Sequence, residues 1–400
     1  MNVIDDRERG SAGQAQGGGM KKGWEIMSLG ELCDVLDHKR KPITKRDREA
    51  GEYPYYGATG VLDKVAGYLF DEPLVLVGED GAKWASGENT AFAVEGKIWV
   101  NNHAHVLRPH RSMLLDNWLI YHLNHSDLNE FVSGLTVPKL NQGSLREIPV
   151  PVPPLPEQRR IVALLDEAFS GLATAKANAE QNLHNARTIF ESHLQAVFSQ
   201  RGLGWVDRQL ASLCTEITVG HVGSMKTEYK ENGIPFLRSQ NIRPFEVSMD
   251  NSMFIDEAFH RNLKKSKLRP GDLAIVRTGY PGTAAVIPPE LPDSNCSDLV
   301  ILRPGEEIDP HFLAAFFNSA FGKQLVLGKI VGAAQKHFNI TAAKEVMLHV
   351  PPMSEQLAIV AKSDELREGT QSLSHLYERK LAALEELKKS LLHQAFNGEL

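Results

Sequence analysis

Apolar residues recur every three or four positions along two long segments of the chain. The first segment runs from Glu157 to Val197, and Gly202 ends its pattern. In the second, Ser354 and Glu355 are predicted to form the cap and first turn. This spacing predicts two amphipathic helices, each of about 43 residues and roughly 65 Å. The apolar stripes are Ile161, Leu165, Ala168, Leu172, Ala175, Ala179, Leu183, Ala186, Phe190, Leu194 and Val197 in the first, and Leu366, Leu373, Tyr377, Leu381, Leu384, Leu387, Leu391 and Ala395 in the second.

The two helices begin with the same sequence motif. Residues 153–163 read PPLPEQRRIVA and residues 351–361 read PPMSEQLAIVA, an offset of 198 residues. A repeat of this length is a whole domain with its connecting helix, not one unit of a solenoid. The match extends beyond the motif to Gly134 and Gly332, Asn141 and Asn339, Glu147 and Glu345, and Asp166 and Asp364, among others. We interpret the repeated glycine and asparagine as hinge or capping residues.

The duplication predicts the architecture. Two equal copies, each ending in a long helix, pack most simply around a pseudo-twofold axis as an antiparallel coiled coil with a globular domain at either end. The alternative is an ordinary helical linker followed by a helical tail. The predicted segments are a disordered tail (1–19), a first globular domain (20–152), a first helix (153–202), a second globular domain (203–350) and a second helix (351–400).

Each globular part mixes strands with short helices, so we predict the α+β class. The apolar runs 74–77 and 273–276 end in polar turns, as strands do. Apolar helices are expected near 117–123 and 310–317.

Composition fits a soluble protein of two or more domains, with 42% hydrophobic and 24% charged residues. No apolar run approaches the ~18 residues of a membrane span. The chain has three cysteines without a CxxC pair, which indicates a reducing cytoplasm rather than disulfides or zinc. Cys33 and Cys214 occupy equivalent apolar positions and are interpreted as core residues.

The net charge of −6 counts against nucleic-acid binding, but the local charge does not. Residues 38–48 (HKRKPITKRDR) and 261–269 (RNLKKSKLR) are basic segments, one in each half. Such a segment can bind DNA or can simply be a solvated surface.

Catalytic motifs are missing from the sequence, including GxxxxGK[ST], GxGxxG, GxSxG and HExxH. One metal-like constellation remains. His103 and His105 would share one face of a strand, and Glu79 or Asp80 would supply oxygen. The second half reads Asn295-Cys296-Ser297-Asp298 at the corresponding place, so we predict a packed or polar-networked histidine pair and no metal.

The two PPxxEQxxIVA segments and the ending LEELKKSLLHQAFNGEL resemble the conserved regions of type I restriction-modification specificity subunits. YPYYGATGVLD, VGEDGA and VNNHAHVLRP in the first half, and IPFLRSQNI and GDLAIVRTG in the second, are similar to stretches of that family's target recognition domains. The likeness covers about residues 20–400.

The resemblance implies a non-catalytic subunit. Each target recognition domain would read one half of a bipartite DNA site, while the helices set the spacing and dock two modification subunits. Methyl transfer from S-adenosylmethionine to adenine would belong to those subunits. ATP- and Mg2+-dependent translocation and cleavage would belong to restriction subunits.

The candidate DNA contacts divide by chemistry. Point charges and exposed cations serve phosphates, whereas forked donors and amides read bases. The predicted phosphate contacts are Lys39, Arg40, Lys41, Lys45, Arg46, Lys264, Lys265 and Lys267. The predicted base-reading residues are Lys83, Asn101, Asn102, Lys139, Arg238, Gln240, Asn241 and Arg277, and Tyr55, Tyr56 and Tyr280 are expected against sugars or a distorted base step.

Alternatives to this function stay open. In one, the helices space two protein-binding domains of a non-DNA adaptor. In another, the chain is a small metalloenzyme centred on His103 and His105. A diverged specificity subunit of another phage-defence system is also compatible with the sequence.

Overall fold

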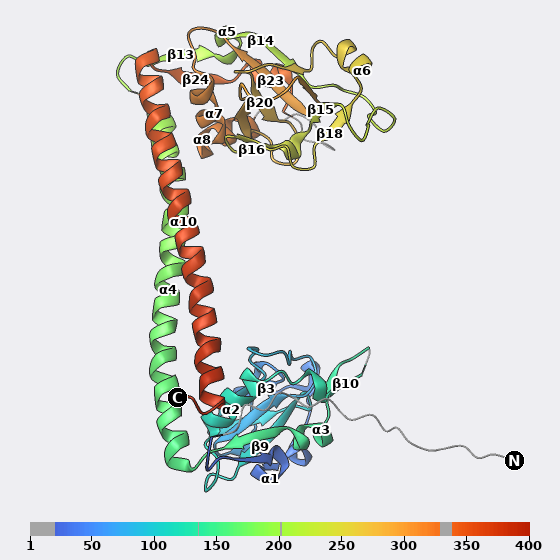
Figure 1. Ribbon diagram of the computed structural model, residues 1–400, viewed down its shortest axis with the longest axis vertical. Coiled ribbons are helices and arrows are strands. Elements are labelled where there is room, and N and C mark those ends of the chain that lie inside the picture. The colour runs from blue at the N-terminus through green and yellow to red at the C-terminus, as the bar shows by residue number, and fades with distance from the viewer. Residues whose placement is uncertain (1–20, 135, 201, 329–337) are drawn as a thin grey trace, which may run out of the picture. The chain divides into compact units, whose positions relative to one another are not determined.

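The computed structural model describes residues 21–134, 136–200, 202–328 and 338–400, and the predicted tail over residues 1–19 lies outside them. The chain divides into two compact units (Figure 1). Unit 1 contains residues up to 179 together with 380–400, and unit 2 contains residues 180–379. Among the described residues, no helix combines the length and the apolar character of a membrane span.

Unit 1 contains two four-stranded sheets. The first, antiparallel throughout, consists in spatial order of β2 (Cys33–Val35), β9 (Ala104–Pro109), β6 (Leu74–Gly78) and β7 (Ala91–Val94). The second consists of β4 (Gly60–Val65), β3 (Ala50–Gly57), β8 (Lys97–Val100) and β5 (Phe70–Asp71). In this second sheet the central pair is parallel and the outer pairs are antiparallel. Two antiparallel pairs complete the unit: β1 (Glu25–Ser28) with β12 (Pro149–Val152), and β10 (Val132–Ser133) with β11 (Lys139–Leu140).

Unit 2 repeats this topology. Its antiparallel sheet consists of β14 (Cys214–Val219), β23 (Leu299–Pro304), β20 (Leu273–Val276) and β21 (Ala284–Val286). Its mixed sheet consists of β18 (Met253–Ile255), β15 (Ile234–Leu237), β22 (Ser294–Cys296) and β19 (Lys267–Leu268), again with a parallel central pair. The remaining pairs are β13 (Val206–Gln209) with β24 (Met347–Val350), and β16 (Ile242–Arg243) with β17 (Glu246–Val247). The two four-stranded sheets and the β1–β12 and β13–β24 pairs have the same strand order and directions in both units, which confirms the internal duplication; β10–β11 and β16–β17 lie at different places in the two units.

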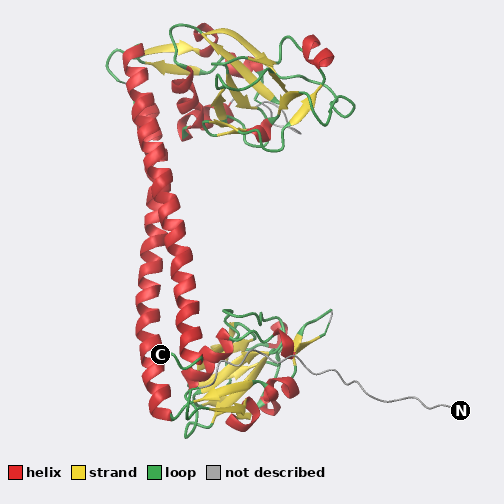
Figure 2. Ribbon diagram, in the orientation of Figure 1, coloured by secondary structure: helices red, strands yellow, loops and turns green. Residues whose placement is uncertain are grey.

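Short helices connect and cover these strands (Figure 2). In unit 1 they are α1 (Leu29–Leu32), α2 (Asp116–His125) and α3 (Gln142–Glu147). In unit 2 they are α5 (Leu210–Leu213), α6 (Glu257–Asn262), α7 (Pro310–Asn318), α8 (Ala320–Gly328) and α9 (Ile340–Lys344). The predicted strands at 74–77 and 273–276 and the predicted helices near 117–123 and 310–317 are confirmed as β6, β20, α2 and α7.

The two long helices are α4 (Leu155–Ser199) and α10 (Met353–Phe396), and each contributes residues to both units. Within each unit their segments lie antiparallel. In unit 1 Lys176 Nζ lies 2.6 Å from Glu385 Oε1, and in unit 2 Arg187 Nη2 lies 2.8 Å from Glu378 Oε1. These pairs are exposed and each stabilises the fold by at most about 1 kcal/mol, so apolar packing carries the association.

The predicted stripe is correct for α4, where all eleven positions are buried or half-buried. It is partly wrong for α10, because Leu373 and Leu387 are 41% and 49% exposed while Ser363 and Thr370 are buried. The Thr370 hydroxyl donates to the carbonyl of Arg367 in its own helix, which allows a polar side chain to be buried at low cost. The helix also begins two residues earlier than expected, at Met353 instead of Glu355, so that Ser354 lies in the first turn rather than at the cap.

Each unit has its own apolar core. In unit 1 the core joins the antiparallel sheet, α2 and the start of α4 to Leu392 and Ala395 at the end of α10. Cys33 lies in this core, and Cys214 packs at the edge of the unit 2 core. Burial raises the pKa of both thiols to about 12, so neither is a nucleophile at neutral pH. The predicted packing role of these cysteines is confirmed.

Candidate nucleic-acid interface

The basic segment of unit 1 lies in a loop with two short 3-10 turns, at Asp37–Lys39 and Lys45–Asp47. Four of its cations are exposed at the surface, and the Arg46 side chain is 91% exposed. Exposed cations on a loop can approach a phosphate backbone without losing a buried partner. The four are Lys39, Lys41, Lys45 and Arg46.

Arg40, in the same segment, points inward. Its side chain is 13% exposed, and Nη2 lies 3.1 Å from Asp37 Oδ2. Nη1 pairs with the Glu79 carboxylate and donates to the Ala104 carbonyl at 2.8 Å. The guanidinium is therefore used within the domain, which contradicts its predicted role as a phosphate contact.

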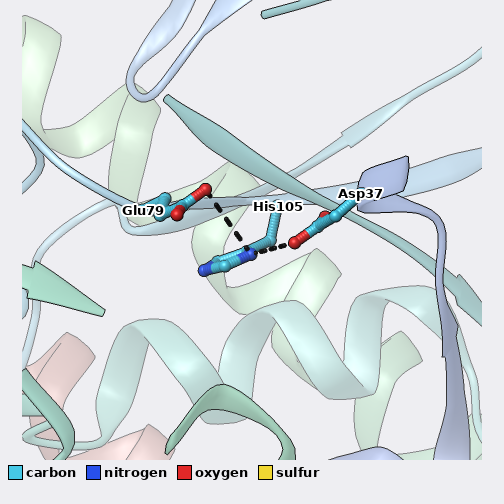
Figure 3. Close-up of side chains that lie close together, drawn as sticks. All are labelled: Asp37, Glu79 and His105. Atoms are coloured by element: carbon cyan, nitrogen blue, oxygen red, sulfur yellow. Dashed lines mark hydrogen bonds and ion pairs between the residues drawn. The ribbon is translucent and has the colours of Figure 1, made fainter. Parts of the chain in front are cut away.

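Arg40 belongs to an ion cluster around His105. Figure 3 shows the His105 imidazole of this cluster between the carboxylates of Asp37 and Glu79. The His105 side chain is fully buried, with Nδ1 2.6 Å from Asp37 Oδ2 and 3.8 Å from Glu79 Oε2. Its Nε2 lies 2.7 Å from the Leu140 carbonyl oxygen. Burial raises the pKa of Asp37, but the hydrogen bond and charge of His105, with smaller contributions from a backbone N–H and Arg40, outweigh it and leave the pKa lowered.

Lys139 completes the cluster from the other side. Its Nζ lies 2.8 Å from Glu79 Oε1, and this hydrogen bond raises the pKa of the ammonium group. Asp37, Glu79 and His105 come close enough together to hold a metal ion. Arg40 and Lys139 already neutralise the two carboxylates, however, so the arrangement fits an internal ion cluster better than a metal centre.

The predicted pairing of His103 and His105 on one face is wrong. β9 begins at Ala104, so His103 lies in the turn before the strand and does not follow its alternation. His103 Nδ1 bonds to the Asp80 carboxylate at the surface, whereas His105 points into the ion cluster. The two imidazoles thus have separate partners.

Three other predicted base-reading residues of unit 1 differ in exposure. Asn101 is 3% exposed, and its Oδ1 accepts the His103 backbone N–H at 2.8 Å. A side chain committed to a buried turn cannot read a base, so the prediction for Asn101 is wrong. Asn102 is exposed, and Lys83 is exposed with its Nζ 3.6 Å from Glu88 Oε1.

In unit 2 the basic segment remains at the surface. Lys264 and Lys265 are exposed and line a groove with His221. Lys267 Nζ lies 3.1 Å from Asp293 Oδ2 in a half-exposed ion pair. These positions suit phosphate contacts.

The predicted base-reading residues of unit 2 also differ in exposure. Asn241 is fully buried; its Oδ1 accepts the Arg238 backbone N–H and its Nδ2 donates to the Ser248 carbonyl. Asn241 therefore shapes a turn, and its predicted contact with a base is wrong. Arg238 Nη2 donates to the Asn251 carbonyl at 2.9 Å, and Gln240 is exposed.

A groove of about 800 Å³ brings Gln240 together with Tyr280, which is 84% exposed. Arg243 and Lys323 also line it, and sequence reasoning missed both. Arg243 follows the IPFLRSQNI segment directly, which was the available signal. Among the other tyrosines, Tyr56 is half-buried and Tyr55 is fully buried, so the prediction for Tyr55 is wrong.

Asn141 and Asn339, from the repeated segments, mark helix starts. Asn339 caps α9, with Oδ1 accepting the Ala342 N–H at 2.8 Å, and Asn141 precedes α3. Gly134 has a φ of +100°, and a Cβ there would lie 2.5 Å from the Val137 carbonyl oxygen. The turn therefore requires glycine at this position. Gly332 lies outside the described residues.

Comparisons with known proteins agree with this architecture. Residues 21–183 match the family of the type I restriction modification DNA specificity domain. A putative type I restriction enzyme specificity subunit of Haemophilus influenzae is 28% identical over 359 residues, covering 88% of this chain and 89% of that protein. The EcoKI specificity subunit of Escherichia coli is 23% identical over 369 residues, covering 85% of this chain and 77% of that protein.

The fold is also similar to a solved one. A chain from a structure on complex assembly and conformational transition of the type I R-M system superposes with a TM-score of 0.72 at 18% identity, covering 96% of this chain and 100% of that one. Two globular units with the same sheet order, each followed by a long helix, define a duplicated two-domain fold. The chain thus matches the model of this family over residues 21–183 and is similar over most of its length to type I restriction enzyme specificity subunits.

Proposed function

We propose that this protein is the DNA-specificity subunit of a type I restriction-modification complex. Each globular domain reads one half of a bipartite DNA site, and the paired helices set the spacing between the halves. The observation that carries this proposal is the repeated topology, in which the same two sheets occur twice and a long helix follows each copy. Two similar readers on two similar helices suit two short sequences separated by a fixed gap.

The proposed DNA contacts are of two kinds, those that bind phosphates and those that read bases. Exposed lysines and arginine on the two basic segments contact phosphates, which gives affinity and salt dependence without sequence information. Side chains beside them read base edges, because Arg suits guanine and amides suit adenine. The proposed readers are Gln240, Arg238 and Arg277 in unit 2, and Asn102 and Lys83 in unit 1. Lys139 is not among them, because its ammonium group pairs with Glu79 in the ion cluster.

The partners are DNA and the modification and restriction subunits of such a complex. We propose that two modification subunits bind, one for each recognition domain. The chain itself is not an enzyme in this function. S-adenosylmethionine, ATP and Mg2+ are used by the partner subunits, and a complex acting on cellular DNA works in the cytoplasm.

The deciding experiment co-expresses this chain with the modification subunit encoded beside it and maps methylated adenines by single-molecule sequencing. A bipartite motif with an unspecified gap is expected. Purified complex should bind that motif with an affinity that falls steeply with salt. A stable complex without new methylation or salt-dependent DNA binding would refute the proposal and favour a protein adaptor.

The spacing role has its own test. Deleting four residues from the middle of both α4 and α10 removes about one turn, or 6 Å, from each helix. The gap in the methylated motif should shift by one or two base pairs while both half-sites keep their sequences. An unchanged gap in an active complex would show that the helices do not set the spacing.

A further inference from the structure

The glutamine of the repeated PPxxEQ motif is buried at the start of α4. Gln158 has no exposed surface, although the buried positions of an amphipathic helix are normally occupied by apolar residues. Its Oε1 accepts the Leu115 backbone N–H at 2.9 Å. Its Nε2 donates to the carbonyls of Met113 and Pro153, both at 2.8 Å. We call Gln158 with these three backbone partners the unit 1 clasp.

Unit 2 contains the same arrangement. Gln356, near the start of α10, is 1% exposed. Its Oε1 accepts the Asp309 N–H at 2.8 Å, and its Nε2 donates to the carbonyls of Glu307 and Pro351 at 3.1 and 3.0 Å. These four residues form the unit 2 clasp. Two independent copies with the same donors and acceptors argue that the geometry itself is required.

Each clasp joins a long helix to the recognition domain of its own unit. Residues 113–115 and 307–309 directly precede α2 and α7, whose apolar residues lie in the domain cores. Apolar packing alone is not directional and tolerates rotation or sliding of a helix on a domain. Hydrogen bonds from one amide to an N–H and a carbonyl of the same loop allow a single orientation, because their strength falls steeply with angle.

Stability alone is a poor explanation for this residue choice. A buried amide must have all its hydrogen bonds, whereas a methionine of similar length would pack without that demand. Elsewhere on the same helices glutamine is an ordinary surface residue, as at Gln181 and Gln371. A fully bonded buried polar group gives one defined arrangement at little net gain in stability.

We infer that Gln158 and Gln356 are positioning residues, which fix the orientation of each recognition domain on its helix and thereby restrict the gap lengths that the complex accepts. This inference rests on the proposed function. The clasps determine how narrow the range of accepted gap lengths is, whereas the length of the helices determines the mean gap length. A recognition domain released from its clasp can lean along the DNA and reach a half-site one base pair nearer or farther.

The test compares Gln158→Met and Gln356→Met with the control variants Gln181→Met and Gln371→Met in the complete complex. The readout is the distribution of gap lengths among methylated sites. Both clasp variants should keep the half-site sequences but methylate sites with gaps one base pair longer and shorter. Discrimination against those gaps should fall on the order of tenfold, as expected for the loss of one or two buried hydrogen bonds. Both controls should keep the single gap.

A clasp variant that methylates only the original gap, with unchanged discrimination, would overturn the inference. A merely structural glutamine would lower yield or melting temperature without changing the gap. Gln158→Asn keeps the amide but is one methylene too short, so it provides a milder variant if Gln158→Met does not fold. If wild type and controls give no bipartite motif, the proposed function fails instead, and the two failures are thereby distinguished.

Discussion

The two globular units place opposite charges at the same backbone position. Glu79 follows β6 and Arg277 follows β20, and each residue makes the same two backbone hydrogen bonds to equivalent neighbours. The Glu79 N–H donates to the His103 carbonyl and its own carbonyl accepts the Leu140 N–H; the Arg277 N–H donates to the Asp298 carbonyl and its own carbonyl accepts the Phe338 N–H. The fold fixes this position, and the sequence decides its chemistry.

The residues around Glu79 and Arg277 differ in keeping with the opposite charges of these two side chains. In unit 1 His105 pairs with Val77 in the sheet, whereas Val300 pairs with Ile275 at the corresponding point of unit 2. The Glu79 carboxylate is neutralised by buried or half-buried cations. These cations are then not available to bind DNA. The Arg277 guanidinium instead has a single hydrogen bond among the described residues, from Nε to a carbonyl at 3.3 Å. A basic residue is therefore available for DNA contact only where no internal carboxylate binds it.

Removing the Glu79 carboxylate is expected to have the largest effect on the difference between the two units. Glu79→Leu leaves Arg40 and His105 buried with one anion fewer, which should destabilise unit 1 by about 3 kcal/mol. Arg277→Leu, the matched change in unit 2, should cost less than about 1 kcal/mol. Urea unfolding followed by tryptophan fluorescence measures both. Equal losses would show that the ion cluster is not a structural requirement of unit 1.

Acid should distinguish the two units next. Unit 1 has His122 in α2, where burial lowers its pKa to about 4, whereas the core face of α7 in unit 2 carries phenylalanines. The unfolded chain binds a proton near pH 6.5 and the folded domain does not, so unit 1 stability falls as the pH drops from 6.5 to 4. The loss from this group should reach at most about 3 kcal/mol.

Urea unfolding at pH 7 and pH 4.5 measures that loss. His122→Gln keeps a donor for the Pro149 carbonyl, which His122 Nε2 now contacts at 2.8 Å, but cannot become protonated. The variant should therefore lose part of the acid sensitivity of unit 1. Parallel pH curves for the variant and wild type would contradict the assignment.

The Arg277→Ala variant tests the proposed role of this side chain in DNA binding. If the guanidinium reads a base, affinity for the methylated motif should fall by about 1–3 kcal/mol, and specificity should relax at one position of a single half-site. Thermal stability should hardly change. Titration of DNA with each base at every position of the motif measures this. A uniform loss across all sequences would instead make Arg277 a phosphate contact.

The smallest expected effect concerns the surface lysines. Lys41→Ala in unit 1 and Lys264→Ala in unit 2 should each weaken DNA binding for all sequences alike. Each should also reduce the slope of log affinity against log salt by about one. Arg40→Lys should leave that slope unchanged, because this half-buried side chain is bound within the ion cluster. A reduced slope for Arg40→Lys would show that the cluster opens on DNA.

The sequence was sufficient for the architecture because repetition and apolar spacing are local signals. The α4 stripe, the strands at 74–77 and 273–276 and the duplication were predicted correctly. The seam of α10 was not, because Ser363 and Thr370 are small and polar, and spacing alone cannot distinguish a buried hydroxyl from an exposed one. Arg40, Asn101 and Asn241 were misjudged for another reason. Their partners depend on strand register and turn geometry, which the type of a residue does not reveal.

The position of Phe396 has a consequence for how the protein is made. Its ring packs against Trp118 with centroids 4.8 Å apart, and Leu392 and Ala395 beside it are buried in the unit 1 core. Residues 118 and 396 leave the ribosome roughly 15–55 seconds apart at ordinary rates of synthesis. During that interval the first domain exposes apolar surface that only the last helical turns can cover. Chaperone binding and proteolysis are therefore expected to act most strongly on nascent chains that have not yet reached this helix end.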